Sequence, residues 1–183
     1  MNHDDGRYRR FLKGDADAFD EIWKEYRLPL TFFINGYLKD LSAAEDVVID
    51  VFTYVLVNPR RYRFHTSLKT YLFMLGRSRA LDYLKHHKVL QMTELSEAEE
   101  TRGDLSLEES VLKEEHKRAL HAALTQLPAP MREAVHLVYF EELSYEETAK
   151  VMKRDKKQID NLLYRAKGLL RDFLGKEYGI HEK

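Results

Sequence analysis

The sequence contains no cysteine, which excludes disulfide bonds, thiolate nucleophiles and cysteine-ligated metal sites. It contains no long apolar run of the length that a membrane-spanning helix needs, so no membrane insertion is expected. The N-terminal stretch MNHDDGRYRRFLKGD lacks the apolar segment and the small-residue cleavage site of a signal peptide. These absences favour a protein of the reducing cytoplasm. With only four prolines and eight glycines in 183 residues, long stretches are free to be helical.

Acidic residues are concentrated in one part of the chain. The net charge is −1, but residues 91–115 hold nine acidic and two basic side chains, a charge of −7, so the remainder carries +6. Two mildly basic lobes therefore flank one acidic strip. Because this asymmetry bears on partners and not on the fold, the small net charge does not by itself exclude nucleic-acid binding.

Helical periodicity dominates the first lobe. Asp15 is expected to cap a helix over about residues 16–34. A capping box that runs from Ser42 to Glu45 is expected to open a second helix, which stops at residues 58–59. The basic and aromatic stretch RRYRFHTS, residues 60–67, is aperiodic and is expected to be a loop. A long helix then follows, starting at Thr66 or Ser67 and ending near residue 87.

The rest of the chain predicts a linker and a second helical lobe. Residues 89–109 lose their periodicity, and helices are expected over 110–126, through residues 134–140, over 145–152 and over 156–173. No strand pattern competes. The predicted fold class is therefore all-α: two small helical domains joined by an acidic linker, with a helix-turn-helix in the C-terminal one. The predicted boundaries are 1–88, 89–109 and 110–183.

The last two predicted helices each open on a capping box, at Ser144–Glu147 and at Asp155–Gln158, and have the spacing of a helix-turn-helix. Asp155 then caps the second helix, and Asp160 faces solvent or pairs with a nearby lysine. The start of this helix carries residues that could reach phosphates and base edges, and a basic stripe continues along it: Lys156, Lys157, Gln158, Asn161, Arg165 and Lys167. The spacing is equally compatible with a helical hairpin whose charged face is merely solvated.

Two separate stretches resemble one protein family. Residues 124–174, LTQLPAPMREAVHLVYFEELSYEETAKVMKRDKKQIDNLLYRAKGLLRDFL, resemble the promoter-binding C-terminal domain of bacterial sigma factors. The segments AAEDVVIDVFTYVL and TSLKTYLFMLGRSRALDYLKHHK resemble their N-terminal core domain. With only these two domains, the chain is similar to the extracytoplasmic-function group of the sigma-70 family. One departure concerns Lys153, which stands where the family usually has a turn glycine.

The resemblance implies a function without catalysis. A sigma factor binds core RNA polymerase and directs promoter recognition, DNA melting and transcription initiation, here for a stress or envelope-response regulon. The helix over 42–57 would meet the polymerase clamp helices through an acidic edge formed by Asp40, Glu45, Asp46 and Asp50. The alternative for these acids is an ordinary solvated face with charges that favour a helix start. The family also implies an inhibitory anti-sigma partner.

The loop and helix over 60–88 would capture the upstream promoter element after melting. Single-stranded bases need stacking faces, and their backbone needs positive charge. The residues expected to meet this DNA are Arg60, Arg61, Tyr62, Arg63, Phe64, His65, Lys69, Tyr71, Arg77, Ser78, Arg79 and Lys85. For the aromatic members Tyr62, Phe64 and Tyr71, the alternative is a place in the core. The C-terminal helix would read the more upstream element as duplex.

Two other classes of protein remain as alternatives. A stand-alone helix-turn-helix regulator would bind duplex DNA tightly without polymerase, but no ligand pocket or zipper pattern is visible. An enzyme is disfavoured because no phosphate-binding loop, zinc motif or cysteine nucleophile is found. His86 and His87 are adjacent, so they point to different sides of a helix and make a poor metal pair. No cofactor and no metal are expected.

Overall fold

A computed structural model describes residues 3–93 and 111–178, and within them the regular structure is entirely helical, as the sequence predicts. The chain divides into two compact units, one comprising Met1–Gly103 with Lys150–Met152 and the other Asp104–Ala149 with Lys153–Lys183. The first half contains α1 (His3–Leu12), α2 (Ala16–Leu38), α3 (Leu41–Val57), the short 3-10 helix η1 (Pro59–Arg61) and α4 (Leu68–Thr93). The second contains α5 (Val111–Gln126), α6 (Ala129–Val135), the π-helix η2 (His136–Phe140), α7 (Tyr145–Met152) and α8 (Lys156–Tyr178).

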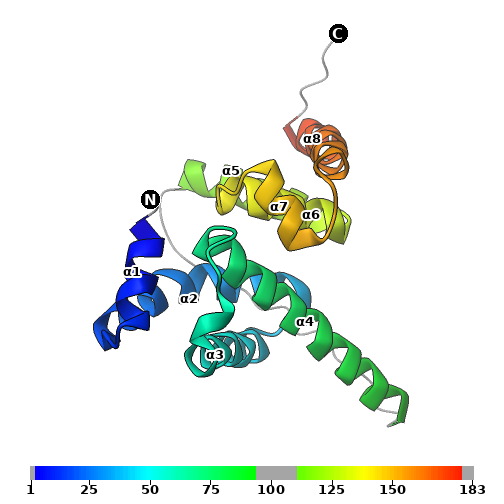
Figure 1. Ribbon diagram of the computed structural model, residues 1–183. Helices are drawn as coiled ribbons and strands as arrows, with labels where there is room; N and C mark the ends of the chain where they lie inside the picture. The colour runs from blue at the N-terminus through cyan, green and yellow to red at the C-terminus, as the bar shows by residue number, and fades with distance from the viewer. Residues whose placement is uncertain (1–2, 94–110, 179–183) are drawn as a thin grey trace. The chain divides into compact units, whose positions relative to one another are not determined.

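Helix α2 is the centre of the first unit, where it packs against α1, α3 and α4 (Figure 1). Its fully buried side chains include Ile22, Leu30 and Ile34. Helix α4 approaches α2 closely at the buried Gly76, where a Cβ atom would lie 3.0 Å from Leu30 Cδ1. Because the two helices meet over a residue without a side chain, α4 packs closely against α2 at this point.

The helix starts of this unit follow local capping chemistry. The Asp15 carboxylate accepts a hydrogen bond from the Ala18 amide at 3.3 Å, and Ser67 Oγ accepts one from the Thr70 amide at 3.2 Å, as predicted. The predicted N-cap of α3, Ser42, is wrong by two residues. The cap of α3 is Asp40, which accepts from the Ala43 amide at 3.1 Å, and Ser42 lies inside the first turn. An aspartate placed upstream competes successfully with the serine for the amides of that turn.

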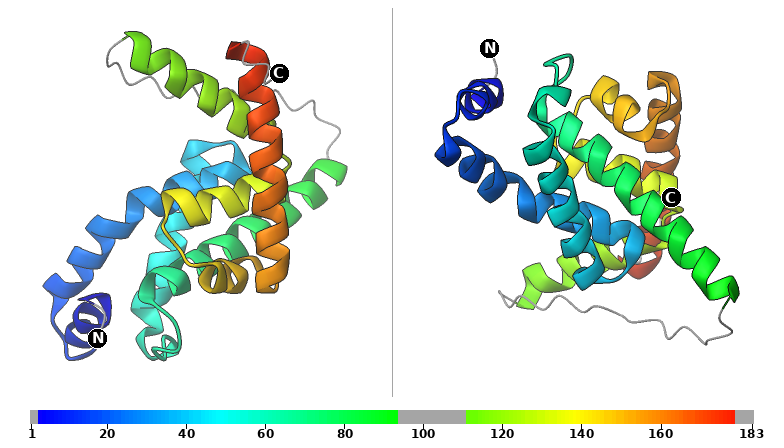
Figure 2. Two further views of the ribbon diagram at one scale, coloured as in Figure 1. Left: turned by 90° about the horizontal axis from the view of Figure 1, so that it is seen from above. Right: turned by 60° about the horizontal axis from the view of Figure 1, so that its bottom comes forward.

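In the second unit, α5 and α6 pack on α8 (Figure 2). Both predicted capping boxes are confirmed. Ser144 Oγ accepts from the Glu147 amide while the Glu147 carboxylate accepts from the Ser144 amide, at 3.2 and 3.0 Å. Asp155 and Gln158 exchange the same pair of bonds at 2.8 and 3.0 Å. These reciprocal bonds fix where α7 and α8 begin.

Three features differ from what the sequence predicts. Helix α1 is a regular helix over residues for which no helix is predicted. Helix α4 continues to Thr93, beyond its expected end, so the first residues of the expected acidic linker are helical. The remainder of that linker, residues 94–109, lies outside the described residues. The third feature is η2, where the helix widens before the left-handed Glu142 (φ 54°) ends it.

The turn between α7 and α8 contains a strained backbone position. Lys153 has φ 53°, in the left-handed region that costs an L-residue about 1–2 kcal/mol and glycine almost nothing. We expect Lys153→Gly to raise the free energy of unfolding by about 0.5–1 kcal/mol, after allowing for the greater freedom of glycine in the unfolded chain. Urea denaturation followed by circular dichroism measures this change.

The matched control is Lys150→Gly, which places the same substitution at an exposed position inside α7. Because glycine is unfavourable within a helix, this variant should lose about 1 kcal/mol. The strain argument for Lys153 is contradicted if both glycine variants shift the urea midpoint in the same direction.

Candidate nucleic-acid interface

The segment between α3 and α4, residues 59–66, presents its positive charge to solvent and is called the arginine loop below. Arg60, Arg61 and Arg63 are exposed and line one hollow together with the end of α3. Tyr62, which lies between them in sequence, points the other way and is only 3 % exposed. The loop therefore alternates outward guanidinium groups with an inward ring. This arrangement concentrates charge that can follow a phosphate backbone on one side of the segment.

Tyr62 supports the loop from within. Its hydroxyl lies 2.8 Å from the Asp5 carboxylate and 2.8 Å from the Thr66 carbonyl. Burial, followed by the hydrogen bond to Asp5, raises the pKa of this phenol well above its usual value, so the proton stays on the oxygen. The structure thus places Tyr62 in the core, the alternative that its aromatic character left open.

Phe64 and its neighbours form the other end of the loop. Phe64 is half-buried with φ 59°, and the guanidinium of Arg9 lies 4.2 Å from the centre of its ring. His65 is exposed, whereas Lys69 is half-buried at 5.9 Å from the Phe73 ring. Tyr71 is also half-buried, with its ring centre 5.2 Å from that of Tyr62, and burial raises its pKa. The tyrosine faces are thus partly used for packing within the loop.

The remaining predicted residues of this set follow along α4. Arg77 is half-buried, Ser78 is exposed, and Arg79 lies over the Tyr54 ring at 5.3 Å. Lys85 is exposed at the far end, 3.9 Å from Asp82. These residues do not gather at one point with the arginine loop. They lie along α4, the helix that follows the loop.

Helix α3 carries the predicted acidic edge. Glu45, Asp46 and Asp50 are exposed, whereas Asp40 caps the helix and so has a structural role as well. Asp50 lines a hollow between α3 and α4 together with Arg79. An acidic residue predicted to bind polymerase therefore lies near a basic residue predicted to bind DNA.

Exposed apolar side chains accompany these acids on α3, and the sequence analysis did not single them out. Ile49 is 52 % and Val57 is 71 % exposed, and Leu56 is half exposed. The available signal was that these positions lie off the buried stripe of α3, which contains Val48, Val51 and Val55. Apolar groups beside charges are typical of a surface that binds another protein.

The predicted DNA-reading residues of α8 are all exposed, but their side chains are in different situations. Lys156 pairs with Glu146 of α7, and this hydrogen-bonded contact raises the pKa of the lysine and lowers that of the glutamate. Gln158 uses its carbonyl oxygen in the cap of α8. Lys167 lies 5.7 Å from the Tyr139 ring. Lys157, Asn161 and Arg165 stand on the solvent side.

Tyr164 is a candidate that the sequence analysis missed. Its side chain is 81 % exposed, and it stands one turn after Asn161 on the outer side of α8. The buried stripe of this helix, Ile159, Leu163 and Ala166, leaves position 164 outside, and that pattern was visible in the sequence. An exposed ring next to basic residues can contact a thymine methyl group or a sugar.

Other kinds of site find little support in the described part of the chain. Within it, no group of three or more His, Asp or Glu side chains is placed to hold a metal ion. None of its helices is long and apolar enough to cross a membrane.

Comparison with known families assigns both halves of the chain. Residues 22–89 match the family described as Sigma-70 region 2, and residues 117–178 match Sigma-70, region 4. The chain is 28% identical over 157 residues to the ECF RNA polymerase sigma factor SigM of Bacillus subtilis, covering 84% of this chain and 93% of that protein. It is 27% identical over 171 residues to the RNA polymerase sigma-H factor of Pseudomonas aeruginosa, covering 86% of each.

Solved structures share the same fold. The sigma factor RpoE of Bartonella quintana, crystallised with the anti-sigma factor NepR, superposes with a TM-score of 0.69 at 22% identity over 85% of this chain and 96% of that one. CnrH, solved with the cytosolic domain of CnrY, gives 0.68 at 16% identity over 96% and 99%. Together with the two family matches, which cover most of the sequence, these findings confirm the predicted resemblance: the chain belongs to the sigma-70 family of bacterial RNA polymerase sigma factors, as a transcription initiation factor of the extracytoplasmic-function group.

Proposed function

We propose that the loop over 59–66 and the helix that follows it capture single-stranded promoter DNA. The observation that carries this proposal is the hollow lined by the exposed Arg60, Arg61 and Arg63. His65 adds an exposed ring, and Phe64 and Tyr71 keep part of their ring surfaces accessible. The proposed path continues along α4 with Lys69, Arg77, Ser78, Arg79 and Lys85. Tyr62 supports the loop from below instead of stacking on a base.

The acidic edge of α3 is the surface we assign to core RNA polymerase. Glu45, Asp46 and Asp50 supply charge for a basic partner, and Ile49 supplies apolar contact beside them. Asp40 serves first as the helix cap and contributes its remaining charge at the edge. A mixed surface of this kind allows electrostatic steering and burial to act together.

Helix α8 is the element we assign to duplex promoter DNA. Lys157 and Arg165 are suited to phosphates, and Asn161 is suited to a base edge in the major groove. Lys156, Gln158 and Lys167 flank them but also hold the helix start or the Tyr139 ring. Tyr164 joins the same set.

We further propose that the protein has no enzymatic activity and that it acts in the cytoplasm, where the polymerase is. Its functional parts are the N-terminal core domain over 1–88, an acidic linker over 89–109, of which residues 89–93 continue α4, and the promoter-binding domain over 110–183. An anti-sigma factor is the proposed inhibitor, because the similar sigma factor RpoE was crystallised with the anti-sigma factor NepR, and CnrH was solved with the cytosolic domain of CnrY. The regulon we propose serves stress or envelope responses, in keeping with the group to which the chain belongs.

The experiment that tests the function is run-off transcription with core polymerase over a library of promoter fragments. We expect transcripts from a defined subset of fragments only when this protein is added. A gel shift without polymerase separates the alternative regulator, which would bind the same duplex strongly alone.

Neutralising the arginine loop should impair melting. We expect the double variant Arg60→Ala with Arg61→Ala to reduce transcription from a duplex promoter by about tenfold or more, since two contacts to a single strand are worth roughly 1 kcal/mol each. Run-off transcription at fixed salt measures the loss. The control is Lys13→Ala with Lys24→Ala, two exposed lysines outside the proposed path. Equal activity of the two double variants would remove the loop from promoter capture.

Charge reversal on α3 should weaken assembly. Asp46→Lys with Asp50→Lys places two positive charges against a basic partner, and we expect the affinity for core polymerase to fall by about tenfold or more. Surface plasmon resonance at two salt concentrations measures the affinity and its salt dependence. The control, Asp17→Lys with Asp20→Lys, changes the same charge on exposed residues of α2. Unchanged affinity in the α3 variant would exclude this edge from the polymerase contact.

On α8, two substitutions should separate sequence reading from charge. Asn161→Ala should relax the preference at one base pair by about 1–3 kcal/mol, whereas Lys157→Ala should weaken all sequences alike and reduce the salt slope by about 1. Competition binding of the holoenzyme to a set of single-base promoter variants, repeated at several salt concentrations, measures both effects. The assignment fails if Asn161→Ala weakens every sequence equally.

A further inference from the structure

Helix α1 lies before the segment that matches Sigma-70 region 2, which begins at residue 22, and no residue of α1 belongs to the interfaces assigned above. Yet three of its residues, Asp5, Tyr8 and Arg9, contact the arginine loop. We propose that α1 is a positioning element that holds the loop over 59–66 in the shape that binds single-stranded DNA. This inference rests on the proposed function of that loop.

The contacts cover the loop from its start to its far end. The hydroxyl of Tyr8 donates a hydrogen bond to the Pro59 carbonyl at 2.8 Å. The Asp5 carboxylate lies 2.8 Å from the hydroxyl of Tyr62, and the Arg9 guanidinium lies 4.2 Å from the centre of the Phe64 ring. Positions 5, 8 and 9 share one side of a helix, so a single face of α1 makes all three contacts.

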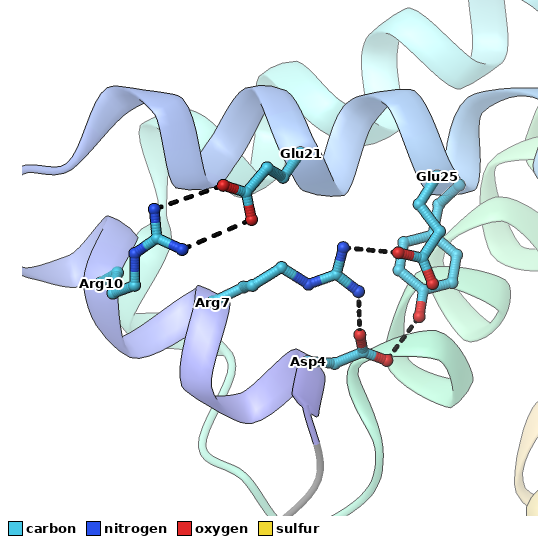
Figure 3. Close-up of polar contacts among 6 residues, drawn as sticks. Asp4, Arg7, Arg10, Glu21 and Glu25 are labelled. Carbon is cyan, nitrogen blue, oxygen red and sulfur yellow. Dashed lines mark hydrogen bonds and ion pairs between the residues drawn. The ribbon is translucent and has the colours of Figure 1, made fainter.

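A second face of α1 fixes it to α2. Arg7 is buried and binds both the Asp4 carboxylate and the Glu25 carboxylate, and the Tyr26 hydroxyl donates to Asp4. Arg10 pairs with Asp15 at 2.8 Å and with Glu21 at 3.3 Å, and Figure 3 shows Arg7 and Arg10 both extended toward the α2 carboxylates. Burial lowers the pKa of Arg7, but the hydrogen bonds to Glu25 and Asp4 more than offset this effect. The pKa of Arg7 is therefore above its usual value, and the guanidinium stays charged.

The loop needs such support because its backbone is strained. Phe64 has φ 59°, a conformation that is uncommon for a bulky residue and that persists only where the surroundings enforce it. Its ring centre lies 6.0 Å from that of Tyr8 and 4.7 Å from that of Tyr62, and Arg9 covers the ring from outside. The neighbours Arg63 and His65 are exposed on either side. Their directions therefore depend on how Phe64 is held.

Tyr8 separates positioning from direct binding. It is 1 % exposed, so its hydroxyl cannot touch DNA in this structure, and any effect of removing that hydroxyl on DNA affinity must pass through the loop. If part of the population loses the competent loop shape, the apparent affinity falls by the same fraction. Lys13, an exposed basic residue just after the end of α1, provides the matched control for Arg9.

The test uses holoenzyme reconstituted with each variant and two labelled probes from a promoter found by run-off transcription. One probe is the single-stranded non-template oligonucleotide of the melted element, and the other is the duplex of the more upstream element. We expect Tyr8→Phe and Arg9→Ala each to weaken the single-stranded probe by about two- to fivefold and to leave the duplex probe unchanged, with Lys13→Ala affecting neither. Fluorescence anisotropy gives the affinities, and thermal unfolding verifies that each variant is folded at the assay temperature.

A double-mutant cycle identifies the route. If Arg9 acts through the Phe64 ring, Arg9→Ala should have no further effect in a Phe64→Leu background, whereas independent contacts would add. Additive losses, equal losses on both probes, or normal single-strand affinity of Tyr8→Phe and Arg9→Ala would overturn the inference. If the inference about α1 fails but Arg60→Ala with Arg61→Ala still weakens binding of the single-stranded probe, the proposed function of the loop stands. When the arginine variant also binds normally, the proposed function itself is wrong.

Discussion

Three exposed arginines, Arg60, Arg61 and Arg63, share one short loop, and because their like charges repel one another, the shape of the loop depends on contacts with the elements around it. Three guanidinium groups within four residues cannot stabilise a short loop by themselves, and the segment has only one turn of 3-10 helix of its own. The buried ring of Tyr62, which lies between the arginines in sequence, anchors the loop on the side opposite to the exposed guanidinium groups. Charge can be concentrated at this point because an aromatic core lies directly beneath it.

This arrangement distributes rigidity unevenly through the first unit. Helices α2 and α4 meet over Gly76, and α1 is fixed to α2 by buried and exposed ion pairs. The arginine loop has neither such close packing nor such ion pairs, and it depends on contacts with α1 and α4. A buried ion pair such as Arg7 with Asp4 contributes little net stability, but it fixes geometry, because moving either partner leaves an uncompensated charge.

Separate modules suit the energetics of opening DNA. Unstacking a base step costs a few kcal/mol, more than a small interface on a nearly neutral protein can supply alone. The proposed contacts, to polymerase through α3, to a melted strand through the loop and to duplex through α8, can be combined when one chain holds all three. We expect the small net charge of −1 to keep DNA binding by the free protein weak.

Local chemistry explains which parts of the structure the sequence could predict. The caps at Asp15, Ser144 and Asp155 depend on residues three positions apart, so they were found from the pattern, as was the family. The cap of α3 was misplaced because Asp40 and Ser42 both suit the role and only the fold chooses. Helix α1 was missed because Tyr8 and Arg7 are stabilised by α2 and the loop, distant in sequence. For the same reason the inward direction of Tyr62 could not be decided from composition.

The cap of α8 has a consequence for what that helix can distinguish. The carbonyl oxygen of Gln158 is directed at the Asp155 amide, so the NH₂ group at the other side of the amide faces away from the helix end. In the proposed duplex complex this side chain therefore presents hydrogen to the groove, which suits purine N7, guanine O6 and thymine O4. It is poorly suited to the amino groups of adenine and cytosine. The hydrogen bond that caps α8 thus biases which bases this helix can recognise.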